Sequence, residues 1–278
     1  MASPELTSTR SPRVTVARRL AKRNHRSAER RFLAEGPQAV REAVAAADAA
    51  IEVYATAEAA ERHPDIVDRA RASGVPVLRA AEDVVAAMSQ TVTPQGMVAL
   101  CRFVDVPLAS LTEPSAPDLV AVLAHVRDPG NAGTVLRAAD AAGAEAVVLT
   151  DASVDLYNPK TVRASAGSLF HLPVVAGPRV EDTVARLRGA GLRVLAADGT
   201  GSADLDDELD AGGLDGPTAW VFGNEAWGLP EETRALADAV VRVPIHGRAE
   251  SLNLATAAAV CLYASARAQR GASGCRAT

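Results

Sequence analysis

Aromatic residues and cysteines are scarce in this chain, and both shortages restrict the protein classes to which it can belong. Its 278 residues include only 4 Phe, 2 Trp and 3 Tyr, so Ala, Val and Leu must fill the core. The cysteines, Cys101, Cys261 and Cys275, are odd in number and lack CxxC spacing. This pattern predicts neither a disulfide framework nor a thiolate zinc site. The five histidines also lack metal-ligand spacing, and we expect no metal.

Long hydrophobic runs are absent as well. Nowhere do eighteen apolar residues follow one another, and the first thirty residues are polar and basic without an apolar stretch. Membrane spanning and secretion are therefore not expected. We expect a cytoplasmic protein that makes no contact with a membrane.

Charge is distributed unevenly along the sequence. The net charge is −5, yet residues 1–31 hold nine basic and only two acidic side chains. Such a basic arm on an acidic body can bind phosphates, because each neutralised phosphate releases a counterion. A solvated terminus is the alternative, and the charge pattern alone does not separate the two.

The chain divides at a proline-containing segment. Residues 32–103 alternate short helical and apolar stretches and predict a small α/β domain. Residues 104–118 contain three prolines among Ser, Thr and Asp and predict a linker. A second domain then spans 119–270, followed by a short tail, 271–278.

Apolar runs alternate with helical stretches in the second domain, a pattern typical of a parallel sheet covered on both faces. The predicted strands are 119–126, 146–149, 172–175, 193–197, 218–222 and 240–243. The predicted helices are 134–142, 160–169, 180–189 and 254–270, and the acidic, glycine-rich residues 199–216 are expected to form a surface loop. A ligand should bind at the carboxyl ends of these strands.

Three motifs follow predicted strands and thus fall where a site is expected. The first runs from His125 to Arg137, in which Asn131 is expected to cap the next helix. The second contains Gly223, Glu225 and Gly228, and the third contains Pro244 and Ser251-Leu252-Asn253. Capping and tight turns explain each motif in isolation.

Together the three motifs resemble those of the SpoU/TrmH family of RNA ribose 2'-O-methyltransferases, which belong to the SPOUT class. Asn131 and Arg137 match the family's Asn and Arg six residues apart, while Gly223, Glu225 and Gly228 match its Gly-x-Glu turn. Pro244 and Ser251–Asn253 match its last motif. The resemblance covers residues 119–268 specifically, and residues 32–103 look like the family's L30e-like RNA-binding domain.

The resemblance implies an α/β fold with a trefoil-knotted carboxyl-terminal domain that binds S-adenosylmethionine in the knot. Its backbone contacts would come, by position, from residues in three loops and strand ends: Gly199, Gly223, Val243, Ile245 and Leu252. The first strand of this domain lacks a following Gly-x-Gly-x-x-Gly, which disfavours an ordinary Rossmann methyltransferase.

Arg137 is the catalytic arginine that the resemblance implies. A guanidinium stays protonated with a pKa above about 12, so we expect Arg137 to bind the target phosphate and stabilise alkoxide charge rather than act as a base. Asn131, Glu225, Ser251 and Asn253 would orient Arg137, the ribose or the cofactor, and the proton acceptor stays open. The family's site is completed across a homodimer. The small-residue run 255–259 suits close helix packing, although a core helix explains it equally well.

The sequence thus predicts S-adenosylmethionine-dependent 2'-O-methylation of a ribose in structured RNA. The additional amino-terminal domain favours ribosomal RNA over transfer RNA. Two alternatives compete with this prediction: a non-catalytic knotted RNA-binding or assembly protein, and a SPOUT base methyltransferase. The complete motif set disfavours the first, and Arg137 with Ser-Leu-Asn disfavours the second.

Overall fold

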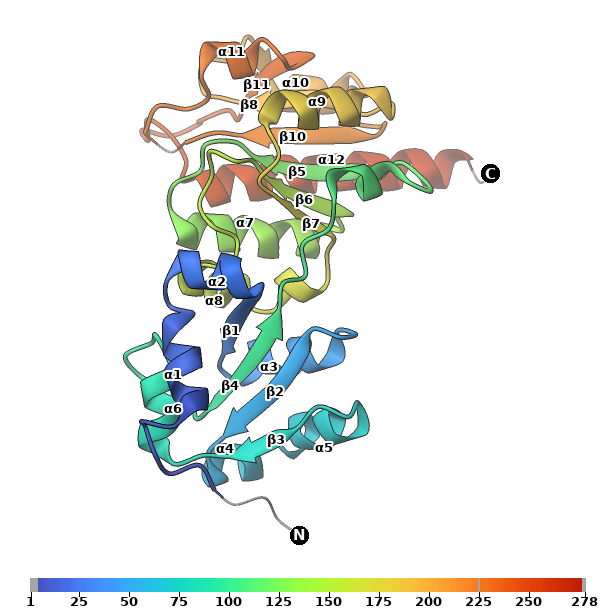
Figure 1. The fold of residues 1–278 in the computed structure, drawn as a ribbon. Coiled ribbons are helices and arrows are strands. Elements are labelled where there is room, and N and C mark those ends of the chain that lie inside the picture. The colour runs from blue at the N-terminus through green and yellow to red at the C-terminus, as the bar shows by residue number, and fades with distance from the viewer. Residues whose placement is uncertain (1–4, 225, 277–278) are drawn as a thin grey trace. The chain divides into compact units, whose positions relative to one another are not determined.

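The computed structural model describes residues 5–224 and 226–276, with side chains described as far as residue 272. This part of the chain forms two compact units (Figure 1). Unit 1 is Met1–Val104 together with Tyr157–His171, and unit 2 is Asp105–Leu156 together with Leu172–Thr278. These boundaries differ from the predicted ones. The sequence analysis assigns residues 157–171 to the second domain, whereas the structure assigns them to unit 1.

Aromatic packing explains why Tyr157–His171 joins unit 1. The ring centroid of Phe32 lies 4.7 Å from that of Tyr157 and 6.0 Å from that of Phe170. Phe103 stacks on Tyr157 at 3.6 Å. These rings form the aromatic part of the unit 1 core, in a chain that has few other large side chains to bury.

Unit 1 contains a four-stranded sheet in the order β1-β4-β2-β3, antiparallel except for the β2–β3 pair. Its strands are β1 (Arg31–Glu35), β2 (Ala50–Ala55), β3 (Val77–Arg79) and β4 (Met97–Arg102). Its helices are α1 (Pro12–Arg19), α2 (Arg23–Glu29), α3 (Pro37–Ala45), α4 (Ala57–Arg62), α5 (Pro64–Ala72), α6 (Glu82–Met88), α8 (Pro159–Ala164) and the 3₁₀ helix η2 (Ser168–Phe170).

The basic segment is folded rather than arm-like from residue 12 onward. Val14, Ala17 and Leu20 are buried in the same hydrophobic cluster as Tyr54. Arg26 is 3% exposed and donates hydrogen bonds to the carbonyls of Leu20 and Ala21, both at 2.8 Å. The sequence analysis predicts an arm and not these helices. The nine basic side chains dominate the composition of this segment, and the three-residue spacing of its apolar residues Val14, Ala17 and Leu20 is difficult to recognise among them.

Unit 2 is built on a seven-stranded sheet in the order β7-β6-β5-β10-β8-β11-β9, in which every pair is parallel. Its strands are β5 (Leu119–Leu123), β6 (Ala146–Leu149), β7 (Val174–Ala176), β8 (Arg193–Ala197), β9 (Ala203–Asp204), β10 (Thr218–Phe222) and β11 (Ala239–Arg242). Its helices are η1 (Leu108–Thr112), α7 (Pro129–Ala142), α9 (Val180–Gly189), α10 (Leu205–Asp210), α11 (Glu231–Arg234) and α12 (Leu254–Arg276). The predicted parallel sheet is confirmed, and β9 is the strand that the sequence misses.

Helices cover the two faces of this sheet. Val120 and Val122 of β5 pack with Val184 and Leu187 of α9 on one face. Side chains alternate along a strand, so Leu119, Ala121 and Leu123 point to the other face, where α7 and α12 contact β5 (Figure 1). All five β5 residues are buried, as expected for a strand covered on both sides.

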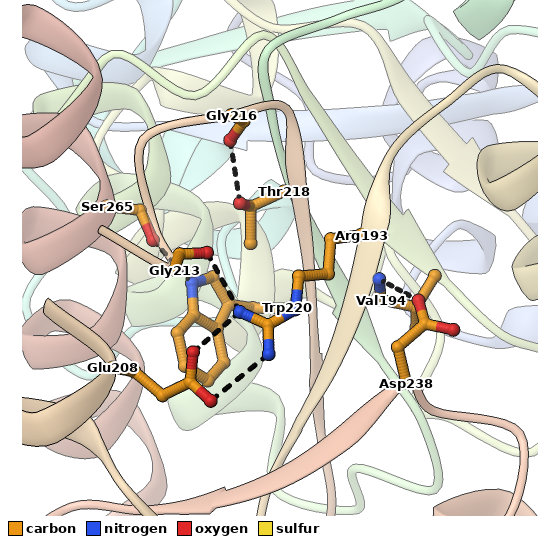
Figure 2. Close-up of polar contacts among 9 residues, drawn as sticks. All are labelled: Arg193, Val194, Glu208, Gly213, Gly216, Thr218, Trp220, Asp238 and Ser265. Atoms are coloured by element: carbon orange, nitrogen blue, oxygen red, sulfur yellow. Dashed lines mark hydrogen bonds and ion pairs between the residues drawn. The ribbon is translucent and has the colours of Figure 1, made fainter. Parts of the chain in front are cut away.

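The acidic segment 199–216 is tied to the sheet and is not a plain loop, contrary to the prediction. The Arg193 guanidinium donates to both Glu208 carboxylate oxygens, at 2.6 and 3.1 Å, and to the Gly213 carbonyl at 2.9 Å (Figure 2). This bidentate contact holds α10, whose N-cap is Asp204. The acids of this segment therefore cap and anchor structure, which composition alone does not reveal.

A hydrogen bond between buried side chains fixes the long last helix to the sheet. The indole Nε1 of Trp220 on β10 donates to Ser265 Oγ on α12 at 2.8 Å (Figure 2). Both residues are fully buried, so each polar atom needs this partner. Within the described residues, none of the helices is both long and apolar enough to cross a membrane.

Candidate active site

A cavity of about 420 Å³ lies at the carboxyl ends of β8, β10 and β11. Three loops contribute to it: Asp198 to Thr200 after β8, Gly223 to Gly228 after β10, and Val243 to Leu252 after β11. The start of α12 closes it with Leu254 and Ala257. This is the edge at which parallel α/β sheets bind ligands.

The residues proposed for cofactor binding share this cavity. Gly199, Gly223, Val243, Ile245 and Leu252 all line it. Ser251, predicted as a catalytic residue, lines it as well. Loops that lie up to 53 residues apart in sequence thus converge at one place, and the contacts of each residue with a ligand remain a prediction.

Gly223 is required by the turn that follows it rather than by open space for a ligand. A Cβ at this position would lie 2.6 Å from the carbonyl carbon and oxygen of Gly228. Asn224 and Gly228 exchange two backbone hydrogen bonds of 2.9 Å, which close the turn against Gly223. The role of Gly223 at the cavity is therefore to permit the turn that shapes the wall.

Asp198 is a site residue that the sequence analysis missed. Its side chain is 5% exposed, and its carboxylate accepts hydrogen bonds from Thr200 N, Thr200 Oγ1 and Leu229 N at 2.9, 2.7 and 3.0 Å. Arg234 lies 3.7 Å away. Burial raises the pKa of Asp198, but these hydrogen bonds and the Arg234 charge outweigh it and leave the pKa below its usual range. One ionised side chain therefore joins the β8 loop to the β10 loop.

The first motif differs from the prediction in its cap. Asp128, not Asn131, caps α7, and its carboxylate accepts from Asn131 N at 2.8 Å. Asn131 Oδ1 instead accepts from Asn253 Nδ2 at 3.2 Å. Asn253 Oδ1 in turn accepts from Ala255 N at 2.9 Å at the start of α12. The first and third motifs are therefore in direct contact, and this contact joins the starts of α7 and α12.

Arg137 lies on the exposed side of α7 and is not part of the cavity lining. Within the described residues it makes no hydrogen bond or ion pair. Its guanidinium is therefore available to another molecule. Glu225, the remaining predicted catalytic residue, lies outside the described residues.

Large exposed apolar side chains gather at two places in unit 2. Trp227 and Ile245, 52% and 38% exposed, line the cavity. Val260 and Tyr263, 39% and 53% exposed, lie on α12, and the Tyr263 hydroxyl donates to the Ala141 carbonyl of α7 at 3.3 Å. We call the exposed side chains of α7 and α12, which include Arg137, Val260 and Tyr263, the α7–α12 face.

The possible metal ligands and the thiols of the described residues are distinguished by their grouping and burial. The described part of the chain holds no group of three or more His, Cys, Asp or Glu side chains able to bind a metal ion. Cys101 and Cys261 are buried free thiols, and burial raises the pKa of both. They are therefore unreactive core side chains.

An all-parallel sheet with a cavity formed by three loops at its carboxyl edge defines an α/β protein with a candidate ligand site. The SpoU rRNA methylase family model matches residues 118–263, and the model of an MRM3-like substrate binding domain matches residues 11–99. The chain belongs to the SpoU rRNA methylase family, which confirms the resemblance seen in the sequence.

Individual relatives agree with this assignment over nearly the whole chain. The 23S rRNA (guanosine(2553)-2'-O)-methyltransferase RlmP of Bacillus subtilis is 32% identical, covering 93% of this chain and 98% of the relative. The crystal structure of an AdoMet-bound rRNA methyltransferase from Sinorhizobium meliloti matches with a TM-score of 0.80 and 33% identity, covering 95% of this chain and 97% of that one. The SpoU methyltransferase AviRb from Streptomyces viridochromogenes, in complex with AdoMet, also gives 0.80, with 29% identity, 94% of this chain and 100% of that one.

Proposed function

We propose that this protein is an S-adenosylmethionine-dependent methyltransferase that modifies a ribose 2'-hydroxyl in ribosomal RNA. The observation that carries the proposal is the cavity at the carboxyl ends of β8, β10 and β11, which collects all five predicted cofactor residues. The RlmP relative, named for methylation of 23S rRNA, supports the substrate class. The AdoMet-bound relatives support the cofactor.

The cavity suits S-adenosylmethionine in size and in chemistry. Its volume of about 420 Å³ falls within the roughly 300–1,000 Å³ of ligand pockets. Val243, Ile245 and Leu252 would supply apolar contacts to the cofactor, and the strand-end loops would offer backbone groups for its polar atoms. The exposure of Trp227 and Ile245 at an otherwise well-packed site fits side chains that a ligand covers.

Residues of all three motifs take part in the proposed reaction. When bound, S-adenosylmethionine supplies an electrophilic methyl group. Arg137 binds the phosphate next to the target ribose and stabilises the charge that develops on the 2'-oxygen, since its guanidinium stays protonated. Asn131 and Asn253 hold the starts of α7 and α12 together through their 3.2 Å contact, and Ser251 faces the cavity. Glu225 belongs to the same proposed machinery.

We propose further that two copies pair through the α7–α12 face. Val260 and Tyr263 expose apolar surface on this face, and a partner would cover it. Arg137 is exposed on α7 and does not line the cavity of its own chain, and we propose that pairing brings it to the partner's site. The trefoil knot implied by the resemblance is also part of the proposed function.

Unit 1 is proposed as the RNA-reading part of the protein. Its match to an MRM3-like substrate binding domain supports this role, as does its exposed basic surface on α1 and α2. An L30e-like fold is proposed for it. A cytoplasmic location is proposed with it, because the proposed substrate is ribosomal RNA.

A deoxy-substituted substrate separates ribose chemistry from base chemistry. Ribose methylation is first mapped on ribosomal RNA from cells with and without the protein, which identifies the target nucleotide. An RNA with one 2'-deoxy nucleotide at that position should still bind but accept no methyl group, because the nucleophile is missing. Methyl transfer to the deoxy RNA would instead support a base methyltransferase, and an unchanged methylation map would contradict the proposed function.

A further inference from the structure

A second cavity lies within unit 1, where it is lined by the end of β1, the start of α3, the segment before β4, and α8. It measures about 250 Å³, below the roughly 300–1,000 Å³ of pockets for drug-sized ligands and suited to a single flat ring. Polar side chains line it: Glu35, Gln38, Thr91, Thr93, Gln95 and Arg163. Gly36 and Ala39 line it as well, and a Cβ at Gly36 would lie 2.7 Å from Gln95 Oε1.

Glu35 is buried at this cavity without full compensation for its charge. Its side chain is 4% exposed. Oε1 accepts a hydrogen bond from Gln90 N at 2.9 Å, whereas the buried Oε2 accepts no hydrogen bond from the described residues. The Arg163 guanidinium lies 3.7 Å from Oε2, too far for a hydrogen bond.

Burying a partly compensated carboxylate costs folding free energy, which a purely structural role for Glu35 does not explain. Burial raises the pKa of Glu35, and the Gln90 and Thr91 backbone groups and Arg163 offset only part of that effect. A glutamine at this position could accept the backbone hydrogen bonds of Gln90 and Thr91 through its uncharged side-chain oxygen. Glu35 lines the cavity, and its unpartnered buried oxygen is a position at which a ligand can supply the missing donor.

We propose that this cavity binds the base of an unpaired guanosine in the RNA substrate. Guanine presents two adjacent donors, N1–H and the 2-amino group, beside the O6 acceptor. The Glu35 carboxylate accepts from the two donors, and the Arg163 guanidinium donates to O6. Adenine, cytosine and uracil each have only one donor group on the Watson–Crick edge. They would therefore make fewer hydrogen bonds to the Glu35 carboxylate than guanine does. The inference rests on the proposed function, in that RNA is the substrate.

Short oligonucleotides test the guanine pocket in the full-length protein. The probes are a uridine heptamer with guanosine at its centre and the same heptamer with inosine, which lacks only the 2-amino group. By fluorescence anisotropy the guanosine probe should bind about tenfold more tightly, because inosine leaves a hydrogen bond to a buried charge unmade. Glu35→Gln should bring this ratio close to one. Glu82→Gln, at another cavity of unit 1, should leave it at about ten.

Melting temperatures and a second variant distinguish binding from folding. Arg163→Met should weaken binding of both probes by a similar factor and leave their ratio near ten, because O6 is present in guanosine and in inosine. A Glu35→Gln protein that melts lower yet keeps the tenfold preference would overturn the inference, because Glu35 would then be structural. Equal affinity of the wild type for both probes would overturn it too. Ribosomal RNA methylation is assayed on the same preparation: methylation without guanosine preference contradicts only the pocket, and preference without methylation contradicts only the proposed function.

Discussion

Arg137 is exposed about two turns into α7 and lies outside the cavity that the cofactor would occupy. Arg137→Ala should therefore abolish methyl transfer, with a loss of at least about a hundredfold, while the dissociation constant for S-adenosylmethionine stays within about twofold. Single-turnover methylation and calorimetry measure the two effects. Arg179→Ala, at the exposed N-cap of α9, is the matched control and should keep full activity. Comparable activity of Arg137→Ala would remove Arg137 from the reaction.

Gly223 illustrates how one missing Cβ shapes a binding wall. Gly223→Ala places a carbon 2.6 Å from the Gly228 backbone, so the turn must move and S-adenosylmethionine affinity should fall by about tenfold or more. Gly216→Ala is the control, because its Cβ meets no atom within 4 Å. Calorimetric titration of both variants provides the measurement. Equal affinity of the two variants would show that this turn does not form the site.

The sequence predicts which residues lie near this site better than it predicts the contacts that each of them makes. Asn131 follows a strand and precedes a helix, so a cap is the expected role, but Pro129 starts the helix earlier and Asp128 becomes the cap. Asn131 is then left to contact Asn253, which is 122 residues away. A contact of that sequence separation depends on tertiary structure and has no local signal.

At the scale of elements, Asp198 couples the loops after β8 and β10. Asp198→Asn replaces one carboxylate oxygen with an NH2 group. This group would face a donor of Thr200 or Leu229, so the free energy of unfolding should fall by roughly 1–3 kcal/mol. Cofactor affinity should fall with it. Asp207→Asn, exposed on α10, is the control. Chemical denaturation followed by circular dichroism measures the difference.

The pH dependence of this difference has a defined sign. The folded state holds the pKa of Asp198 below its usual range, so the carboxylate stabilises the fold above the unfolded pKa. This contribution disappears as the pH falls through the lowered folded pKa. Wild type and Asp198→Asn should therefore converge in stability in acid and differ most near neutral pH. A constant difference across this range would contradict the ionic role of Asp198.

The most deeply buried strands are those that the sequence predicts best. β5 and β10 are buried along their whole length and β8 in its middle three residues. Their largely apolar sequences predict a parallel sheet covered on both faces. β9 has only two residues and lies in an acidic segment, so no periodicity marks it. α1 and α2 are missed because their polar positions outnumber the few that become buried. Asp198 is missed for a related reason, since a single acid at a strand end carries no pattern.

At the scale of the whole molecule, Val260 tests pairing of two copies. Val260→Glu puts a charge into the proposed interface, and the protein should become monomeric in sedimentation velocity and lose methylation. Val92→Glu is the matched control, because Val92 is a fully exposed valine of unit 1. Mixing Arg137→Ala with Gly223→Ala should restore part of the activity, since one site of the mixed dimer keeps both residues. A wild-type protein that sediments as a monomer would contradict the pairing.

The return of Tyr157–His171 to unit 1 has a consequence for synthesis on the ribosome. Phe32 emerges early, but its partners Tyr157 and Phe170 are made only after β5, α7 and β6 of the other unit. At about 5–20 residues per second, the nascent first unit must wait several seconds with part of its aromatic core uncovered. Residues 1–104 alone would leave the Phe32 ring without Tyr157 and Phe170. A fragment ending at residue 104 should therefore aggregate more readily than the intact chain. The two units are thus interleaved in time as well as in sequence.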